Sequence, residues 1–246
     1  MNIPSLIAAS GLVARERAIE VTATNLANLN TPGFQASRVK FADWLSPQPQ
    51  GAALPGEPRI AYAQDRATWR ETQAGPVTHT ANPFDLALQG EGYFTVATAK
   101  GPRLTRDGRF GPLPDGTIGD SAGNRLLDVN GRPIPLTPTD TRITISGDGT
   151  VSSENGQLGR IGVVTPEDPM KLKAEGNTLF LADTPTRRVA RPAIVQGAME
   201  GSNVPPVLEV TRMMNELREF QFTTQLIQAE DDRLRAVTDK ILARNG

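Results

Sequence analysis

The sequence contains no cysteine and only one histidine among its 246 residues. A chain without thiols forms no disulfides, no thiolate nucleophile and no zinc–sulfur site. The single histidine, His79, excludes a histidine-rich metal site and disfavours a nucleophilic triad. We therefore expect no metal, no cofactor and no enzymatic activity.

An excess of charge of one sign is also missing. The chain has 26 basic and 27 acidic residues, which gives a formal net charge of −1. This balance provides no large electrostatic field for phosphate backbones or anionic lipids, so we expect no nucleic-acid partner.

Long apolar runs are absent as well. No stretch approaches the roughly 20 apolar residues that span a bilayer, so we expect no membrane insertion. Charged residues such as Arg15, Glu16 and Glu20 interrupt the first thirty residues, which therefore lack the apolar segment of a cleavable signal peptide. We expect a protein that is cytoplasmic or exported by a route that needs no such signal.

Both ends of the chain carry apolar residues that repeat every seven positions. Such a period is typical of helices that pack lengthwise as a coiled coil. The two ends are therefore expected to pair with each other or with other copies, and to become fully ordered on assembly. The expected assembly interface consists of Leu12, Ile19, Leu26, Val210, Met213, Leu217, Phe220, Ile227, Leu234 and Ile241.

Breaks in the pattern divide the chain into four segments. Residues 1–30 are expected to form the N-terminal helix, which ends before Pro32 and Gly33. Residues 31–75 are expected to form a linker, because their middle is rich in proline and glycine. Residues 76–200 alternate in short runs separated by Asp-Gly and Asn-Gly turns, which predicts a β-rich domain. Residues 201–246 contain the C-terminal helix, which follows two prolines.

These segments predict an α+β fold. A mainly antiparallel β domain lies in the middle, because the short strands follow one another without helical patterns between them. N- and C-terminal α-helices flank this domain and pair as a coiled coil.

Four blocks of sequence resemble the signature blocks of the bacterial flagellar rod and hook family, in order along the chain. They are Asn25–Asn28 with Thr31–Phe34, Asp85–Phe94, Leu104–Phe110 and Glu200–Val204. The chain departs from the family pattern at Thr24 and at Pro205-Pro206. The motif residues are Asn25, Asn28, Pro32, Gly33, Phe34, Asp85, Leu86, Gly90, Gly92, Phe94, Arg106, Gly108, Phe110, Glu200, Gly201, Ser202 and Asn203.

The resemblance implies a structural subunit of the flagellar basal-body rod, the hollow shaft that crosses the periplasm and transmits torque. Chain length fits the two mid-sized rod proteins, and the abrupt passage into a proline-rich segment is more similar to the proximal than to the distal one. The implied partners are other copies, neighbouring rod proteins and the flagellar export apparatus. The terminal helices are expected to mediate helical self-assembly.

Single motif residues also suggest local roles. Asn25 and Asn28 can cap or bridge backbone groups near a helix end. Asp85 is expected to be a solvent-facing strand residue that bonds a neighbouring loop, and Arg106 and Asp107 are expected to pair or to close a turn.

Three alternatives stay open. The chain could be the distal rod protein, or a monomeric β-rich binding module with helices packed on it. It could also be a glycan hydrolase that uses two carboxylates, for which Asp85 and Asp107 are the obvious candidates.

Overall fold

The computed structural model describes residues 3–45, 61–176 and 178–244. Its residues fall into two compact units. The first, here called the helical unit, comprises Met1–Ala27, Ser37–Trp69 and Pro205–Gly246. The second, called the β unit, comprises Asn28–Ala36 and Arg70–Val204.

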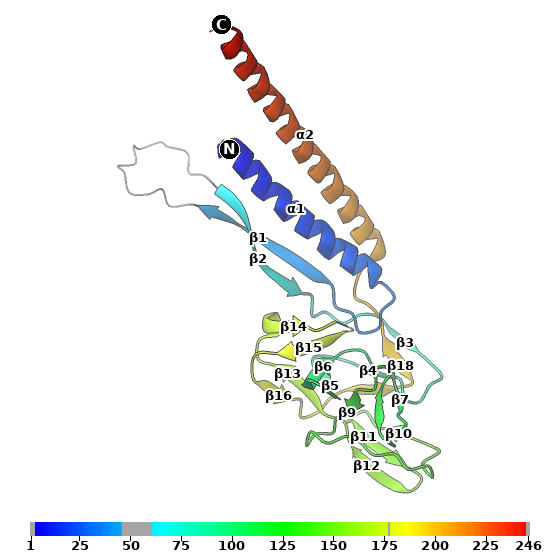
Figure 1. The fold of residues 1–246 in the computed structure, drawn as a ribbon. Coiled ribbons are helices and arrows are strands. Elements are labelled where there is room, and N and C mark those ends of the chain that lie inside the picture. Colours follow the sequence, from blue (N-terminus) through cyan, green and yellow to red (C-terminus); the bar gives the residue numbers. More distant parts are fainter. Residues whose placement is uncertain (1–2, 46–60, 177, 245–246) are drawn as a thin grey trace. The chain divides into compact units, whose positions relative to one another are not determined.

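The helical unit contains two long antiparallel helices, α1 (Ile3–Ala27) and α2 (Pro206–Arg244), which lie side by side (Figure 1). The helices have 25 and 39 residues, so they are about 38 and 58 Å long. Because α2 exceeds α1 by about 20 Å, α1 alone cannot cover it. The first helix ends three residues before the expected Asn30, and the Thr31 amide donates to the Asn28 carbonyl in a tight turn.

Two strands accompany the helices and correct the expectation that residues 31–75 form a linker throughout. β1 (Ser37–Leu45) and β2 (Ala61–Arg70) form a two-stranded sheet. The sequence of β1 alternates Arg38 and Lys40 with Val39 and Phe41, a period of two that favours a strand. The proline-rich run between the strands, from 46 to 60, lies outside the described residues.

The β unit is built from short strands, and each pairing between named strands in it is antiparallel. Its largest sheet has nine strands, in the order β14-β15-β6-β5-β9-β8-β7 with β13 and β16 attached, and smaller sheets are β10-β11-β12, β17-β4 and β18-β3. The strands are β3 (Val77–His79), β4 (Leu86–Leu88), β5 (Tyr93–Thr98), β6 (Gly101–Thr105), β7 (Phe110–Pro112), β8 (Ile118–Asp120), β9 (Arg125–Leu126), β10 (Thr144–Ile145), β11 (Thr150–Ser153), β12 (Gly156–Arg160), β13 (Val163–Pro166), β14 (Leu172–Ala174), β15 (Leu179–Ala182), β16 (Thr186–Arg188), β17 (Ile194–Gln196) and β18 (Ala198–Glu200), with one 3-10 turn at Pro169–Lys171. The prediction of a mainly antiparallel β region flanked by two helices is confirmed.

One apolar core holds the β unit together. Its members are almost fully buried, and the rings of Phe94 and Phe110 meet edge to face with centroids 5.4 Å apart. A smaller cluster lies around Tyr93 and Phe180. The main core consists of Leu86, Leu88, Phe94, Val96, Phe110, Ile118, Leu126, Ile134, Ile143, Ile145, Val151, Ile161, Val163 and Ile194.

Candidate assembly interface and motif cluster

The predicted seam residues are only partly covered within a single chain. Leu12, Ile19 and Leu26 of α1 are half-buried, and so are Met213, Phe220, Ile227 and Leu234 of α2. The side chain of Ile241 lies outside the described residues. The structure therefore leaves part of each predicted seam accessible.

The most buried apolar positions of α1 are not the predicted seam. Ala14 and Val21 are each 8 % exposed, and Asn25 is fully buried. These residues share one helix face, which lies away from that of Leu12 and Ile19. The seven-residue pattern selected large apolar side chains, whereas small side chains allow the closest approach between elements. The pattern therefore missed the most buried face of α1.

A second apolar stripe on α2 is exposed. Val207, Val210, Met214 and Leu217 follow one helix face at spacings of three and four residues. Their exposed fractions are 78, 43, 50 and 39 %. Val210 and Leu217 belong to the predicted interface, and Val207 and Met214 extend it. Exposed apolar stripes of this kind are common at interaction surfaces.

A buried polar cluster joins three elements of the helical unit. The Glu209 carboxylate, at the start of α2, accepts from Arg38 Nη1 at 2.8 Å, Asn25 Nδ2 at 3.2 Å and Arg212 Nη1 at 2.9 Å. Asn25 also exchanges two hydrogen bonds of 2.9 Å with the backbone of Ser37, as its expected bridging role requires. Glu209 and Arg38 were missed in the sequence, where the one signal was an acidic residue in the first turn of a helix.

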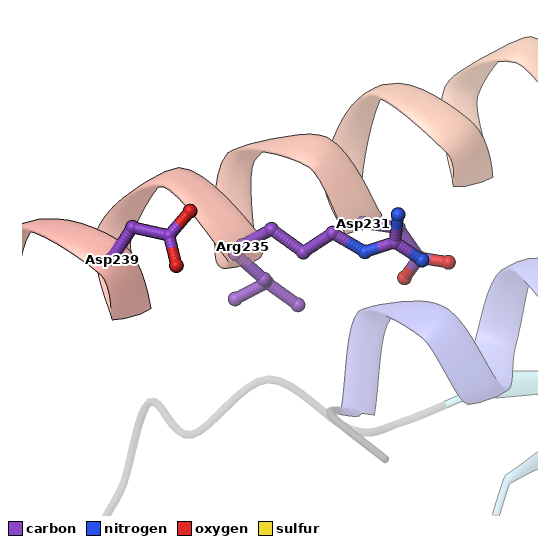
Figure 2. A pocket seen from close by; sticks show the side chains of 4 residues that line it. Asp231, Arg235 and Asp239 are labelled. Atoms are coloured by element: carbon purple, nitrogen blue, oxygen red, sulfur yellow. The ribbon is translucent and has the colours of Figure 1, made fainter. Parts of the chain in front are cut away.

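A shallow groove lies near the C-terminal end of α2. It is lined by Asp231, Leu234, Arg235 and Asp239. Figure 2 shows the Arg235 side chain extended along the helix toward Asp231, with Asp239 one turn further on. All three charged residues are exposed and come from a single helix. The groove therefore has neither the enclosure nor the converging groups of a catalytic site.

In the β unit, the motif blocks meet around a buried ion pair. Arg106 Nε lies 3.4 Å from Glu200 Oε2, and both side chains are almost fully buried. Arg106 also donates to the Gly90 carbonyl at 2.8 Å. The Gly33 amide donates to the Glu200 carbonyl, and the Gly75 amide donates to the Glu200 carboxylate. One pair of charges therefore gathers residues from every block that lies in this unit.

Burial and the neighbouring charge shift the pKa of Glu200 in opposite directions. Burial raises the pKa of Glu200, and the nearby Arg106 guanidinium and Gly75 amide partly offset that rise. Burial also raises the pKa of the Tyr93 hydroxyl, which donates to Gln35 Oε1 at 3.0 Å. Both shifts have burial as their main cause, and within the cluster Arg106 Nε, Arg106 Nη1 and Glu200 Oε2 are buried without a hydrogen-bond partner.

Asn203 of the last block also connects separate segments of the β unit through hydrogen bonds. Its Oδ1 accepts from the Ala36 amide at 2.7 Å, and its Nδ2 donates to the carbonyls of Glu71 and Gln73, each at 2.8 Å. The Asn203 amide donates to the Phe34 carbonyl. This one side chain therefore binds residues 34–36 to residues 71–73.

The glycines of the motif permit close backbone approach. A Cβ on Gly108 would lie 1.6 Å from the Leu86 carbonyl oxygen, because Gly108 packs directly on β4. Gly33 has φ of +66°, and a Cβ there would lie 2.3 Å from the Arg106 carbonyl carbon. Only glycine fits both positions without a shift of the backbone.

The remaining motif side chains have structural surroundings. Leu86, Phe94 and Phe110 belong to the main core, and Asn28 accepts a hydrogen bond from the Thr31 hydroxyl. A Cβ on Gly92 would lie 2.8 Å from a methyl of Val163. Ser202 is buried, Gly201 donates its amide to Pro76, and Pro32 is half-buried.

Of the two hydrolase candidates, Asp85 bonds a neighbouring loop as expected but is not solvent-facing, and Asp107 closes a turn as expected. Asp85 is buried, 7 % exposed, where a solvent-facing position was expected, and its carboxylate accepts from Thr80 and Asn82. Arg106 pairs with Glu200 and not with Asp107. Asp107 closes a turn with Arg109, at 3.1 Å. Both candidate carboxylates are thus engaged in local structural bonds.

Comparison with known proteins identifies the family. The chain is 32 % identical to the flagellar basal-body rod protein FlgF of Caulobacter vibrioides over 228 residues, which cover 92 % of each chain. It is 34 % identical to FlgF of Mesorhizobium japonicum, over 90 % of each chain. This chain belongs to the flagellar basal-body rod protein family. It is also 31 % identical to the rod protein FlgG of C. vibrioides, over 94 % of this chain and 96 % of that one.

Three family profiles match separate parts of this rod-family chain. The flagella basal body rod protein profile matches residues 6–35, and the flagellar hook protein FlgE/F/G D1 domain matches residues 87–153. The flagellar basal body rod FlgEFG protein C-terminal profile matches residues 195–240. Each matched range contains at least part of one motif block, so the resemblance seen in the sequence is confirmed.

The described part of this rod protein offers no metal centre and no membrane span. Residues 3–45, 61–176 and 178–244 contain no group of three or more His, Asp or Glu side chains placed to hold a metal ion. Neither helix, within the same described ranges, has a stretch apolar enough to cross a bilayer.

Proposed function

We propose that this chain is a structural, non-enzymatic subunit of the flagellar basal-body rod and that copies of it assemble through their terminal helices. The observation that carries the proposal is the exposed apolar stripe Val207, Val210, Met214 and Leu217 on α2. In a single chain this stripe is exposed to water. Relatives of the chain are named as flagellar basal-body rod proteins, which fits a surface that is covered when subunits assemble.

The occupant of the stripe is a second copy of the chain. Pairing within one chain leaves two parts of α2 uncovered: the stripe near its start, and its C-terminal end, which extends past α1 because α2 is about 20 Å longer (Figure 1). The stripe is apolar and carries no charge, which matches another apolar helix face and not a charged ligand. Burying four such side chains contributes about 1.5–3 kcal/mol each before the cost of association.

Of the two mid-sized rod proteins, the proximal one, FlgF, fits this chain better than the distal one, FlgG. The FlgF alignment spans 228 residues and an equal share of both chains. The FlgG alignment spans 256 positions, more than the 246 residues of this chain, so it includes residues that this chain lacks. The distal type is the second candidate, supported by the 31 % identity to FlgG.

The rest of the proposal follows from a rod subunit of this kind. The chain is exported through the flagellar export apparatus, joins other copies and neighbouring rod proteins, and transmits torque across the periplasm. Its terminal helices supply the coiled-coil contacts, with Ile241 and the other seam residues among them.

Charged substitutions on the stripe test the proposal in the full chain. Met214→Glu with Leu217→Glu should abolish polymerisation, seen by electron microscopy and sedimentation of concentrated protein, and should abolish motility of cells that carry the variant. The monomer should keep its thermal midpoint within a few degrees, because both side chains are already exposed.

The matched control places the same charges elsewhere on α2. Asn215→Glu with Ala229→Glu changes two exposed positions that lie off the stripe, and it should leave assembly intact. Normal polymerisation of the stripe variant, or equal loss in the control, contradicts the proposed surface.

A further inference from the structure

The buried cluster around Glu209 is not needed to explain assembly, yet it places two charges in the interior of the helical unit. The Glu209 side chain is fully buried and that of Arg38 is 13 % exposed. Taking two charges out of water costs several kcal/mol per ion, and a buried pair seldom stabilises a fold more than apolar residues of the same size do. Such a pair is therefore better suited to selecting one arrangement than to adding stability.

The contacts of Glu209, itself in α2, reach α1 and β1. Arg38 and Ser37 begin β1, Asn25 lies in the last turn and a half of α1, and Arg212 lies one turn along α2 from Glu209. The distances of 2.8, 3.2 and 2.9 Å place three donors on one carboxylate. The two bonds between Asn25 and the Ser37 backbone hold the start of β1 against α1.

The predicted seam alone does not fix the direction of β1. The seam residues of both helices are half-buried, and a seven-residue repeat presents similar surfaces at successive turns. The Glu209 cluster, in contrast, is satisfied in one arrangement only, because Arg38 and Asn25 must reach the same carboxylate. A direction of β1 that takes Arg38 away would leave the buried Glu209 carboxylate with Arg212 as its remaining charged partner.

We propose that Glu209 is a positioning residue: through Arg38 and Asn25 it sets the direction in which the β1–β2 sheet leaves the α1–α2 pair. The cluster specifies this arrangement and contributes little net stability. The inference concerns the single chain and does not depend on the proposed assembly.

Distances between two spin labels test this role in the full chain. The sequence has no cysteine, so cysteines introduced at Asp43 of β1 and Gln225 of α2 are the only labelling sites. With Glu209 intact, pulsed electron paramagnetic resonance should give one narrow distance distribution. The apolar double variant Arg38→Leu with Glu209→Met should broaden or split it.

The thermal midpoint separates positioning from simple stabilisation. The apolar double variant should melt within about 4 °C of the parent or above it, because the desolvation cost of two charges is removed. Glu209→Gln, which keeps the shape of the side chain, should broaden the distance distribution less than the double variant does. The exposed pair Arg17 and Glu20, changed to Leu and Met, should leave the distribution narrow.

Two results overturn the proposal. The first is a narrow, unchanged distance distribution in the folded apolar double variant. The second is loss of cooperative unfolding in that variant, because the cluster would then be a source of stability and not of direction.

Discussion

The two units of this chain differ in how far they bury their apolar side chains. In the β unit, fourteen apolar side chains form one core and each is less than 10 % exposed. On α2, in contrast, Val207, Leu208, Phe222 and Leu226 are all more than half exposed. The β unit therefore encloses its own apolar core, whereas the helical unit leaves apolar side chains of α2 exposed.

The polar interiors of the units differ as well. The β unit uses its buried pair, Arg106 and Glu200, to hold motif segments that are distant in sequence. The helical unit uses Glu209 and Arg38 to hold the first strand against its helices. The first pair also lies beside an aromatic ring of the smaller apolar cluster, because Arg106 Cζ is 5.8 Å from the centroid of the Tyr93 ring.

The largest expected effect compares the same residue type in both units. Phe94→Ala should destabilise the β unit by about 3–5 kcal/mol, because a fully buried ring that packs on Phe110 is removed. Phe222→Ala should change stability by no more than about 0.5 kcal/mol, because that ring is 68 % exposed. Urea unfolding, followed by circular dichroism, measures both.

A similar loss in the two variants would break the comparison. It would mean that Phe222 is covered in solution, so that the helical unit buries its apolar surface without a partner. A sedimentation experiment at the same concentration shows whether a second copy provides that cover.

A smaller effect is expected from two nearby glycines of the β unit, Gly108 in the loop before β7 and Gly111 in β7. Gly108→Ala should cost about 1–3 kcal/mol, because the new methyl group meets the Leu86 carbonyl and the backbone must move. Gly111→Ala has open space around the new Cβ and should cost less than about 1 kcal/mol. Thermal unfolding distinguishes them, and an equal cost would show that the motif glycine is not required for close packing.

The sequence predicted the parts of this fold that depend on local pattern. Asp-Gly and Asn-Gly pairs indicated turns, and Gly116, Gly131 and Gly149 have the positive φ that such turns use. The seven-residue repeat predicted long helices at both ends. The motif blocks predicted the family, because they could be matched without knowledge of contacts.

The contacts between distant residues could not be predicted in this way. Glu209 and Asn25 are 184 residues apart, and nothing in either local pattern indicates that they meet. Arg106 and Glu200 are also distant in the sequence, and Arg106 was instead expected to pair or to close a turn with the adjacent Asp107. Strands β1 and β2 were missed because the proline-rich run between them dominated the composition of the whole segment.

The smallest expected effects come from pH, and they have opposite signs in the two units. In the β unit, hydrogen bonds from Thr141 and from the Arg142 amide lower the pKa of Glu154 from 4.5 to about 2. In the helical unit, burial raises the pKa of Glu216, and a hydrogen bond from Thr22 only partly offsets that rise. One carboxylate is therefore stabilised in its charged form and the other in its neutral form.

Glutamine variants make the opposite signs measurable. The folded state releases the Glu154 proton more readily than the unfolded state, so the stability due to Glu154 is present above pH 4.5 and is lost as pH falls toward 2. Glu154→Gln should therefore lower the thermal midpoint near pH 6 and have no effect near pH 2. Glu216→Gln should raise the midpoint above the raised pKa of Glu216, because wild-type stability falls as pH increases through that pKa, and the difference should vanish below pH 4.5. If both variants shift the thermal midpoint in the same direction near pH 6, the helical unit does not bury Glu216 in solution.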